Sequence, residues 1–284
     1  MSVKIISDST CDLSPELIAR YDVQILPLHI VLGDAEYLDG ATITPEEIYA
    51  WSDEHKTTPK TSALSADTAY DAFKAQLEAG NEVVCFAISG HMSTTVNILR
   101  MAAEDLNATD RIFVIDSMNL STGIGLQVIE AAILAKQGKS GAEISEHILA
   151  LRDRVRASFV VDTLTYLHRG GRCSGLAALA GSALKLHPRI AVSEGKMAPG
   201  KKYRGAIGKV ILSYVKDMEA ELLKAKPDRV FITHSGCDAA TVEQVRAYLE
   251  SLHHFDEILE TRAGCVISSH CGPNTLGVLF IAGE

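Results

Sequence analysis

The chain has 284 residues, of which 47% are hydrophobic and 22% are charged, and its formal net charge is −9. This balance is that of a globular protein, and the length suffices for one large or two modest domains. Polyanions are held by basic patches, so the negative charge and the lack of Lys/Arg runs longer than Lys201–Lys202 argue against binding to nucleic acids or anionic membranes.

Short β-branched runs alternate along the chain with helical patterns, which is typical of an α/β fold. Most of these runs are continuously apolar, as buried parallel strands are. In chain order, strands are expected at Val3–Ser7, Val23–Leu32, Val83–Ile88, Ile112–Asp116, Ala157–Val161, Arg189–Ser193, Arg229–Thr233, Cys265–Ser269 and Leu276–Ala282.

Helix ends are marked by capping residues. Ser14-Pro15 and Thr44-Pro45 each combine an N-cap with a proline at the first helical position. Ser140-x-x-Glu143 is a capping box, and Gly80 and Gly138 are placed as C-terminal stops. Together with the apolar patterns, these signals predict further helices near residues 66–79, 94–106, 121–136, 141–154, 205–225 and 238–252.

The composition changes after the predicted helix 141–154, which places a domain boundary near residues 155–162. We expect a mostly parallel N-terminal α/β domain over 1–158 and a second α/β domain over 159–284. The N-terminal apolar run is too short for a signal peptide, and no apolar stretch approaches the roughly 20 residues of a membrane span. The six cysteines form no Cys-x-x-Cys pair. We therefore expect a cytoplasmic protein with reduced thiols.

Small polar residues follow the expected strands where each strand ends. They are Asp8–Thr10, Ser89–Thr95, Ser117, His234–Gly236 and His270. Ligands of open α/β sheets bind beyond the carboxyl ends of the strands, and Ser93 or Thr94 would also begin a helix, where free N–H groups favour an anion. Any one of these residues could be a simple cap or turn residue. The set as a whole indicates a site for a carboxylate or a phosphate.

Known catalytic motifs fit the chain poorly. Residues 195–202 mimic a phosphate-binding P-loop, but Lys202 stands where Ser or Thr should bind magnesium. Gly-x-Gly-x-x-Gly after the first strand, Gly-x-Ser-x-Gly and His-Glu-x-x-His are absent from the sequence, and His253-His254 is interpreted as a solvated helix end. A hydrolase built from Ser93, His270 and Asp8 stays open, because triads are recognised by geometry.

Motifs over nearly the whole chain resemble those of the DegV family of lipid-binding proteins, in the same order. They are residues 6–13, 59–62, 88–95, 114–118, 166–175, 185–188 and 269–274. The most specific stretch reads Tyr-Leu-His-Arg-Gly-Gly-Arg-Cys-Ser-Gly, from Tyr166 to Gly175. Any one of these motifs alone is weak, whereas their order is a strong signal.

The resemblance implies a two-domain α/β fold with a long-chain fatty acid buried at or near the domain interface. It also implies a bacterial lipid carrier, without a metal or other cofactor, that presents its ligand to a separate fatty acid kinase. The ligand-binding residues implied by motif position are Thr61, Ser62, Ser93, Thr94, Arg172 and His270. In this scheme the hydroxyls of Thr61 and Ser93 hold the carboxylate. The region 164–186 could line part of the tunnel, although Leu176, Leu179 and Leu184 could equally be plain core.

The chain departs from the family pattern close to the expected head group. His91 adds a bulky titratable side chain, and Cys271 and Asn274 replace a small apolar residue and a glycine near His270. Ser62-Ala63-Leu64 is less polar than the residues that commonly follow this threonine in the family. These departures leave the identity of the ligand open.

Two other functions remain compatible with the sequence. One is a serine-dependent hydrolase or acyl transferase that uses Ser93 and His270. The other is a regulatory protein that responds to lipid occupancy through an interface. The acyl length, the partner and the oligomeric state are not set by the sequence.

Overall fold

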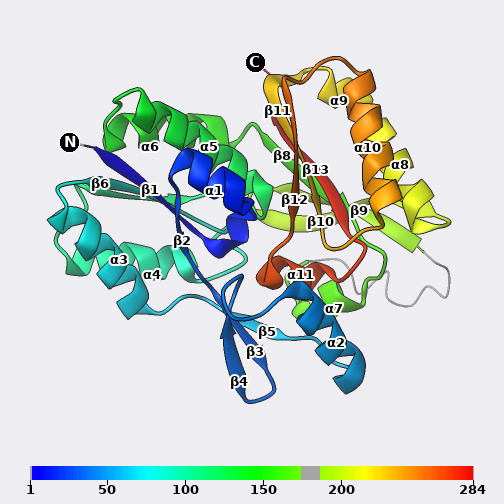
Figure 1. Cartoon of the computed structure of the whole chain (residues 1–284), viewed down its shortest axis with the longest axis horizontal. Coiled ribbons are helices and arrows are strands. Elements are labelled where there is room, and N and C mark those ends of the chain that lie inside the picture. Colours follow the sequence, from blue (N-terminus) through cyan, green and yellow to red (C-terminus); the bar gives the residue numbers. More distant parts are fainter. Residues whose placement is uncertain (1, 174–185, 284) are drawn as a thin grey trace.

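Two main β-sheets lie side by side in the computed structural model, which describes residues 2–173 and 186–283 (Figure 1). A third, small sheet projects below them. Helices cover both main sheets, so the predicted α/β class is confirmed. The segment 174–185, which includes Leu176, Leu179 and Leu184, lies outside the described residues, and their predicted part in a tunnel stays a prediction.

The first sheet is parallel throughout, in the order β2-β1-β6-β7. Its strands are β1 (Val3–Asp8), β2 (Gln24–Leu26), β6 (Glu82–Ala87) and β7 (Ile112–Asp116). A 3-10 turn, η1 (Ser9–Cys11), follows β1, and the flanking helices are α1 (Pro15–Tyr21), α3 (Ala66–Glu78), α4 (Thr95–Asp105), α5 (Thr122–Lys136) and α6 (Gly141–Arg152). Alternate residues of β6 face opposite sides: Val84 and Phe86 pack with α5 and α6, and Val83 and Cys85 with α3 and α4.

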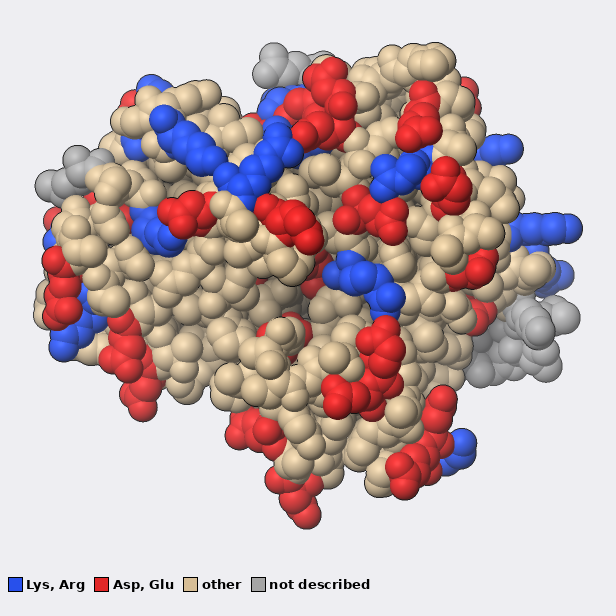
Figure 2. Space-filling view, viewed as in Figure 1, with Lys and Arg blue, Asp and Glu red and all other residues tan. Residues whose placement is uncertain are grey.

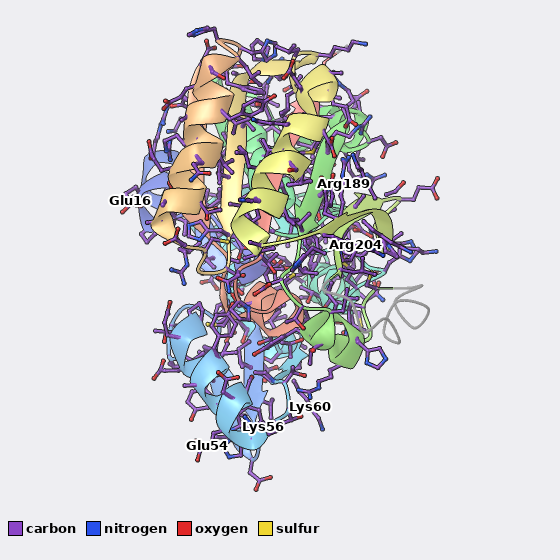
Figure 3. The ribbon with its side chains drawn as sticks, turned by 90° about the vertical axis from the view of Figure 1, so that its right-hand side faces the viewer. Glu16, Glu54, Lys56, Lys60, Arg189 and Arg204 are labelled. Carbon is purple, nitrogen blue, oxygen red and sulfur yellow. The ribbon has the colours of Figure 1, made fainter. Side chains whose placement is uncertain are left out.

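The second sheet has the order β10-β9-β8-β13-β11-β12, and among these described strands only the pair β11–β12 is parallel. The strands are β8 (Val155–Val160), β9 (Leu186–Ser193), β10 (Lys196–Arg204), β11 (Ala225–His234), β12 (Glu257–Arg262) and β13 (Leu276–Ala282). Figure 3 shows α8 (Ile207–Asp217) and α10 (Ala239–Ser251) side by side on one face. Continuous apolar runs do not imply parallel pairing here, because antiparallel strands covered on both faces are just as apolar.

Helix α5 joins the two sheets into one core. Its residues 122–132 are all buried, and it contacts β1 and β6 of the first sheet and β8 and β13 of the second. A helix that is apolar on every side belongs inside a protein. The predicted boundary between residues 158 and 159 falls inside β8, which pairs entirely with strands of the second sheet. The division into two domains at that position stays a prediction.

The small antiparallel sheet, in the order β4-β3-β5, is accompanied by α2 (Pro45–His55). Its strands are β3 (His29–Leu32), β4 (Ala35–Leu38) and β5 (Lys60–Ser62). The predicted strand Val23–Leu32 is in fact two strands, β2 and β3, in different sheets. Pro27 lies between them, and a proline cannot donate a ladder hydrogen bond.

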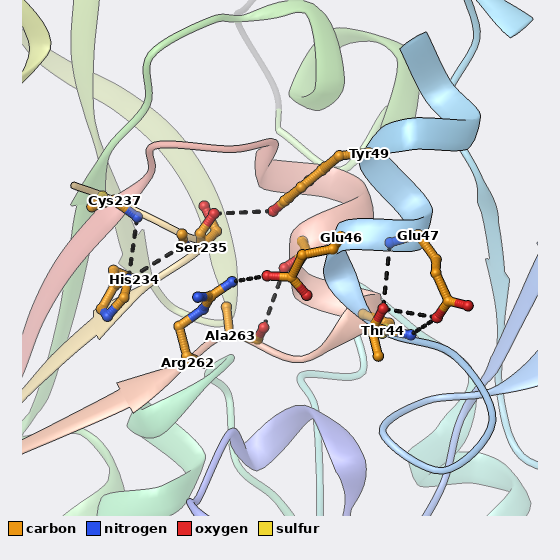
Figure 4. Close-up of polar contacts among 12 residues, drawn as sticks. Thr44, Glu46, Glu47, Tyr49, His234, Ser235, Cys237, Arg262 and Ala263 are labelled. Atoms are coloured by element: carbon orange, nitrogen blue, oxygen red, sulfur yellow. Dashed lines mark hydrogen bonds and ion pairs between the residues drawn. The ribbon is translucent and has the colours of Figure 1, made fainter. Parts of the chain in front are cut away.

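Polar contacts fasten α2 to the second sheet (Figure 4). Arg262 pairs with Glu46 at 2.7 Å, and the hydroxyl of Tyr49 donates to the carbonyl of Ser235 at 3.3 Å. Thr44 and Glu47 form a capping box at the start of α2, where the sequence predicts a helix start. These contacts tie α2, the helix that accompanies the small sheet, to the second sheet.

Two further predicted elements are wrong. Cys265–Ser269 is not a strand but the first part of helix α11 (Cys265–Cys271), because a short apolar run fits a buried helix as well as a strand. The helix predicted over 205–225 is two helices, α8 and α9 (Glu219–Leu222), and β11 begins at Ala225. The short helix α7 (Thr165–Gly170) and the strands β4, β5, β10 and β12 are not predicted from the sequence.

The surface carries charges of both signs. On the face shown in Figure 2, Lys and Arg side chains are interspersed with Asp and Glu side chains instead of forming one basic patch. Among the described residues, no helix has the length and apolarity needed to cross a membrane.

Candidate ligand cavity

A cavity of about 480 Å³, called here the ligand cavity, lies where the β6–α4 loop, β5 and α11 meet. All six predicted ligand-binding residues line it: Thr61, Ser62, Ser93, Thr94, Arg172 and His270. Four segments far apart in sequence therefore converge on one space, as expected beyond the carboxyl end of a parallel sheet. The cavity volume is within the usual range for small-molecule sites.

Ser93 and Thr94 lie at the N-terminus of α4, directly after the loop that follows β6. The N–H of Thr95 donates to the hydroxyl oxygen of Ser93 at 3.3 Å. The side-chain hydroxyls of Ser93 and Thr95 also share a hydrogen bond of 2.9 Å. Thr94 is the N-cap residue, but its side chain makes no capping hydrogen bond. The positive end of the α4 dipole thus lies beside hydroxyls that face the cavity, which favours an anionic group there.

Thr61 and His270 also line the cavity. Oγ1 of Thr61 and Nε2 of His270 are 2.8 Å apart and share a hydrogen bond. Burial, together with the nearby guanidinium of Arg172, lowers the pKa of His270 to about 4. The ring is therefore neutral near pH 7 and contributes a hydrogen bond, not a charge.

Packing fixes the ring of His270 on its other side. Its Nδ1 atom is buried and has no hydrogen-bond partner among the described residues. Gly170 lies directly against it, since a Cβ atom at that position would be 2.3 Å from Nδ1. A side chain larger than hydrogen at residue 170 would displace the imidazole.

Two buried carboxylates anchor the N-terminus of α11, the helix that carries His270. Asp12 accepts a hydrogen bond from the N–H of Gly264 at 2.8 Å, and Asp39 accepts one from the N–H of Cys265 at 2.6 Å. Burial raises the pKa of both carboxyl groups. Their position at the helix start satisfies N–H groups that no intrahelical partner could reach.

The remaining walls of the ligand cavity are largely apolar. They include Leu28, Ile88, Leu120, Val266 and Ile267. A small adjoining cavity of about 30 Å³ shares Leu120, Ile267 and Cys271 with the first, and Phe159 and Leu279 of the second sheet also line it. The apolar surface thus continues from the polar end at Thr61 and Ser93 towards the core between the sheets.

The hydrogen bonds of a Ser93–His270–Asp8 triad are not formed. The Asp8 carboxylate accepts hydrogen bonds from Thr10 and, at 2.8 Å, from the N–H of Ile88. Burial raises the pKa of Asp8 to about 6, although these hydrogen bonds oppose the shift. His270 directs Nε2 to Thr61, so the atom that would take a proton from Ser93 is already engaged.

The segment that mimics a P-loop is a β-strand. Residues 196–204 form β10, which pairs antiparallel with β9. Glu194 and Gly195 form the turn between them, with φ angles of 49° and 74°. A phosphate loop connects a strand to a helix, so the geometry excludes this interpretation.

The residues that depart from the family pattern do not all line the ligand cavity. His91 and Cys271 line the ligand cavity. Asn274 instead donates from Nδ2 to Asp162 at 3.2 Å. Met197 of β10 is a lining residue that the sequence does not reveal. Gly195, which adopts a positive φ in the turn, is the local signal that could have indicated the hairpin before this strand.

No metal site is found among the described residues, since none of their His, Cys, Asp and Glu side chains form a group of three or more that could hold an ion. The six cysteines form no disulfide with one another. Burial raises the pKa of Cys11 to about 12, so this thiol is not poised as a nucleophile.

Comparison with known proteins gives a consistent result over the full length. A family model described as an uncharacterised protein of the DegV family matches residues 2–283. A DegV domain-containing protein of Deinococcus radiodurans is 31% identical over 278 residues, which cover 98% of each chain. One from Clostridium perfringens is 30% identical over 279 residues, again 98% of each.

Solved structures agree in fold. A DegV family protein from Thermus thermophilus, described as binding a fatty acid, superposes with a TM-score of 0.91 at 31% identity, over 99% of this chain and 100% of that one. A stearic acid-binding protein from Eubacterium ventriosum has a TM-score of 0.85 at 29% identity, over 99% of this chain and 98% of that one.

Proposed function

The chain belongs to the DegV family, and from this premise we propose that it binds one long-chain fatty acid in the ligand cavity and does not act as a complete enzyme. The observation that carries the proposal is the convergence of all six predicted residues on one cavity with a polar end and apolar walls. The relatives from Thermus thermophilus and Eubacterium ventriosum, described as fatty-acid-binding proteins, support it.

The polar end suits a carboxylate. A buried charge without hydrogen bonds is very costly, so the head group needs donors. Thr61, Ser93 and Thr94 all line the cavity, and each hydroxyl can donate one hydrogen bond. No Asp or Glu lines the cavity among the described residues, so nothing there repels an anion directly.

The apolar walls suit the acyl chain. Burial contributes about 0.8 kcal/mol per CH₂, so a long chain offers on the order of 10 kcal/mol before ordering costs. The small cavity beyond Leu120 and Ile267 extends the apolar surface in the direction that the tail would take.

The bound fatty acid would be passed on to a partner protein. The bound carboxyl group would be presented to a separate fatty acid kinase, since the described residues contain no P-loop and no metal site. Because six cysteines without a disulfide pair suit a reducing compartment, we also propose a cytoplasmic location.

Native mass spectrometry of the protein purified from a bacterial host tests the function. We expect one fatty acid per chain, released on denaturation and lost in the Thr61→Ala/Ser93→Ala double variant. A protein that stays empty after incubation with a panel of fatty acids would contradict the proposal. Turnover of an activated ester that Ser93→Ala abolishes would support the hydrolase instead.

A further inference from the structure

A third cavity of about 290 Å³, called here the outer cavity, adjoins the ligand cavity. It is lined by His91, Met92, Gly171, Arg172, Lys196 and Met197. His91, Met92, Arg172 and Met197 line both cavities, whereas Gly171 and Lys196 line the outer one alone. The two spaces therefore share one wall beside the polar end of the ligand cavity.

Specific backbone contacts build the outer cavity. The hydroxyl of Ser89 donates to the carbonyl of Gly195 at 2.7 Å, which ties the β9–β10 turn to the β6–α4 loop. The approach is so close that a Cβ atom on Gly195 would lie 2.6 Å from Oγ of Ser89 and 2.9 Å from Cδ2 of His91. Lys196 is thereby placed next to His91.

A second contact brings Arg172 to the same place. Cys173 forms an isolated β-bridge with Met197, the residue that follows Lys196. The Arg172 guanidinium also donates to the carbonyl of Gly170 at 2.7 Å, which restricts its position. Two cations from separate segments are thus held at one cavity by hydrogen bonds and backbone pairing, so their proximity is built into the fold.

The charge around the outer cavity is one-sided. Its described lining contains Arg172, Lys196 and His91 but neither Asp nor Glu, although the chain as a whole carries a net charge of −9. The Asp116 carboxylate near the loop accepts hydrogen bonds from the N–H groups of Gly90 and Met118. Glu194, in the turn itself, lines a different cavity. Two cations in one recess, with no ion pair to an acidic side chain among the described residues, favour an anion.

We propose that the outer cavity is a binding site for a phosphate group, held by Arg172 and Lys196 beside His91. A carboxylate is already served by the hydroxyls of the ligand cavity, and a phosphate brings more charge and three acceptor oxygens, which match a guanidinium and an ammonium group. The phosphate is either the head group of a lipid whose chain fills the ligand cavity or a free phosphate. The first case rests on the proposed function, and the second does not.

The test compares two lipids of equal chain length, hexadecanoic acid and hexadecylphosphonic acid, by their Kd values for the full chain. The tail contribution cancels in the ratio of the two affinities. We expect Lys196→Gln to lower the preference for the phosphonate about tenfold, the cost of one charge-assisted hydrogen bond. Lys202→Gln is the matched control, because Lys202 is exposed on the same strand but does not line the cavity.

A second arm separates the sources of the phosphate. Inorganic phosphate binding is followed by phosphorus NMR in wild type, Lys196→Gln and Lys202→Gln. A saturable site that Lys196→Gln weakens supports a free phosphate, even if neither lipid binds and the proposed function fails. If Lys196→Gln changes neither the lipid preference nor phosphate binding, the outer cavity is no phosphate site and the inference is wrong.

Discussion

Thr61 of β5 and His270 of α11 share a hydrogen bond of 2.8 Å although 209 positions separate them in sequence. The bond joins the small sheet to the helix that the two buried carboxylates anchor. Because the His270 ring is neutral near pH 7, Thr61 and His270 present hydrogen-bonding groups without a formal charge. The polar end of the cavity can therefore receive a carboxylate without an obligatory counter-charge from His270.

Thr61→Val replaces the hydroxyl by a methyl group of similar size and tests that role. We expect fatty acid affinity to fall about tenfold, because a hydrogen bond to a charged group is worth about 1.5–3 kcal/mol. Ser93→Ala should have an effect of similar size. The measurement is a fluorescent fatty acid titration, and Thr57→Val, an exposed threonine shortly before β5, is the control. Equal affinities for Thr61→Val and Thr57→Val would remove Thr61 from the carboxylate site.

His270→Gln tests the depressed pKa through stability. The pKa of His270 falls from an ordinary 6.5 to about 4 in the fold, so the unfolded chain binds this proton first as the pH drops. His270 therefore weakens the fold progressively from pH 6.5 down to pH 4, on the order of 2 kcal/mol near pH 4.5. The Gln variant should lose this part of the pH dependence.

Urea denaturation of the ligand-free protein at about pH 7.5 and about pH 4.5 measures the difference. Asp8, whose pKa is raised to about 6, contributes a dependence of opposite sign, but it is common to both proteins and cancels in the comparison. His147→Gln, at an exposed position of α6, is the control. The same pH dependence in His270→Gln and wild type would contradict a neutral, buried imidazole.

The sequence predicts the first sheet well and α11 poorly, for a physical reason. Strands such as Ile112–Asp116 are recognised because a buried parallel strand is a short β-branched run between polar turns. Cys265–Ser269 has the same local pattern, yet it is helical. Asp12 and Asp39 satisfy the start of this helix from far away in the chain, and no local pattern contains that information.

The site residues also divide into those that the sequence predicts and those that depend on contacts between distant segments. Thr61, Ser93 and His270 are implied by motifs, and the structure brings them to one cavity. The antiparallel strand β10 was not predicted, so Lys196 and Met197 could not be placed beside the cavity. Their position depends on a hairpin turn and on its contact with Ser89, a pairing between segments that local propensity does not encode.

Asp39→Ala tests whether the anchor of α11 positions His270. The change removes the acceptor for the N–H of Cys265 and for the Ser9 hydroxyl, so we expect a loss of about 1–3 kcal/mol of stability and weaker fatty acid binding. Ser140→Ala removes the N-cap of α6, which should cost about 1 kcal/mol. It should leave fatty acid binding unchanged, because α6 does not line the ligand cavity. Urea denaturation and lipid titration of both variants decide whether binding follows the α11 anchor or follows stability in general.

Gly195→Ala tests the close contact between the β9–β10 turn and the β6–α4 loop. Gly195 has a φ of 74°, and its missing side chain makes room for Ser89 and His91. Gly138→Ala is the matched control: its φ is 81°, and no atom lies within 4 Å of the position of its Cβ. Both variants place alanine in the left-handed region, which costs about 1 kcal/mol. Gly195→Ala also creates a clash, so we expect it to lose about 1–3 kcal/mol more in urea denaturation. Because the turn carries Lys196, the variant should also weaken phosphonate binding more than Gly138→Ala does. Equal stability losses in the two variants would mean that the turn does not press against the loop, and the outer cavity would then lack the contact that forms it.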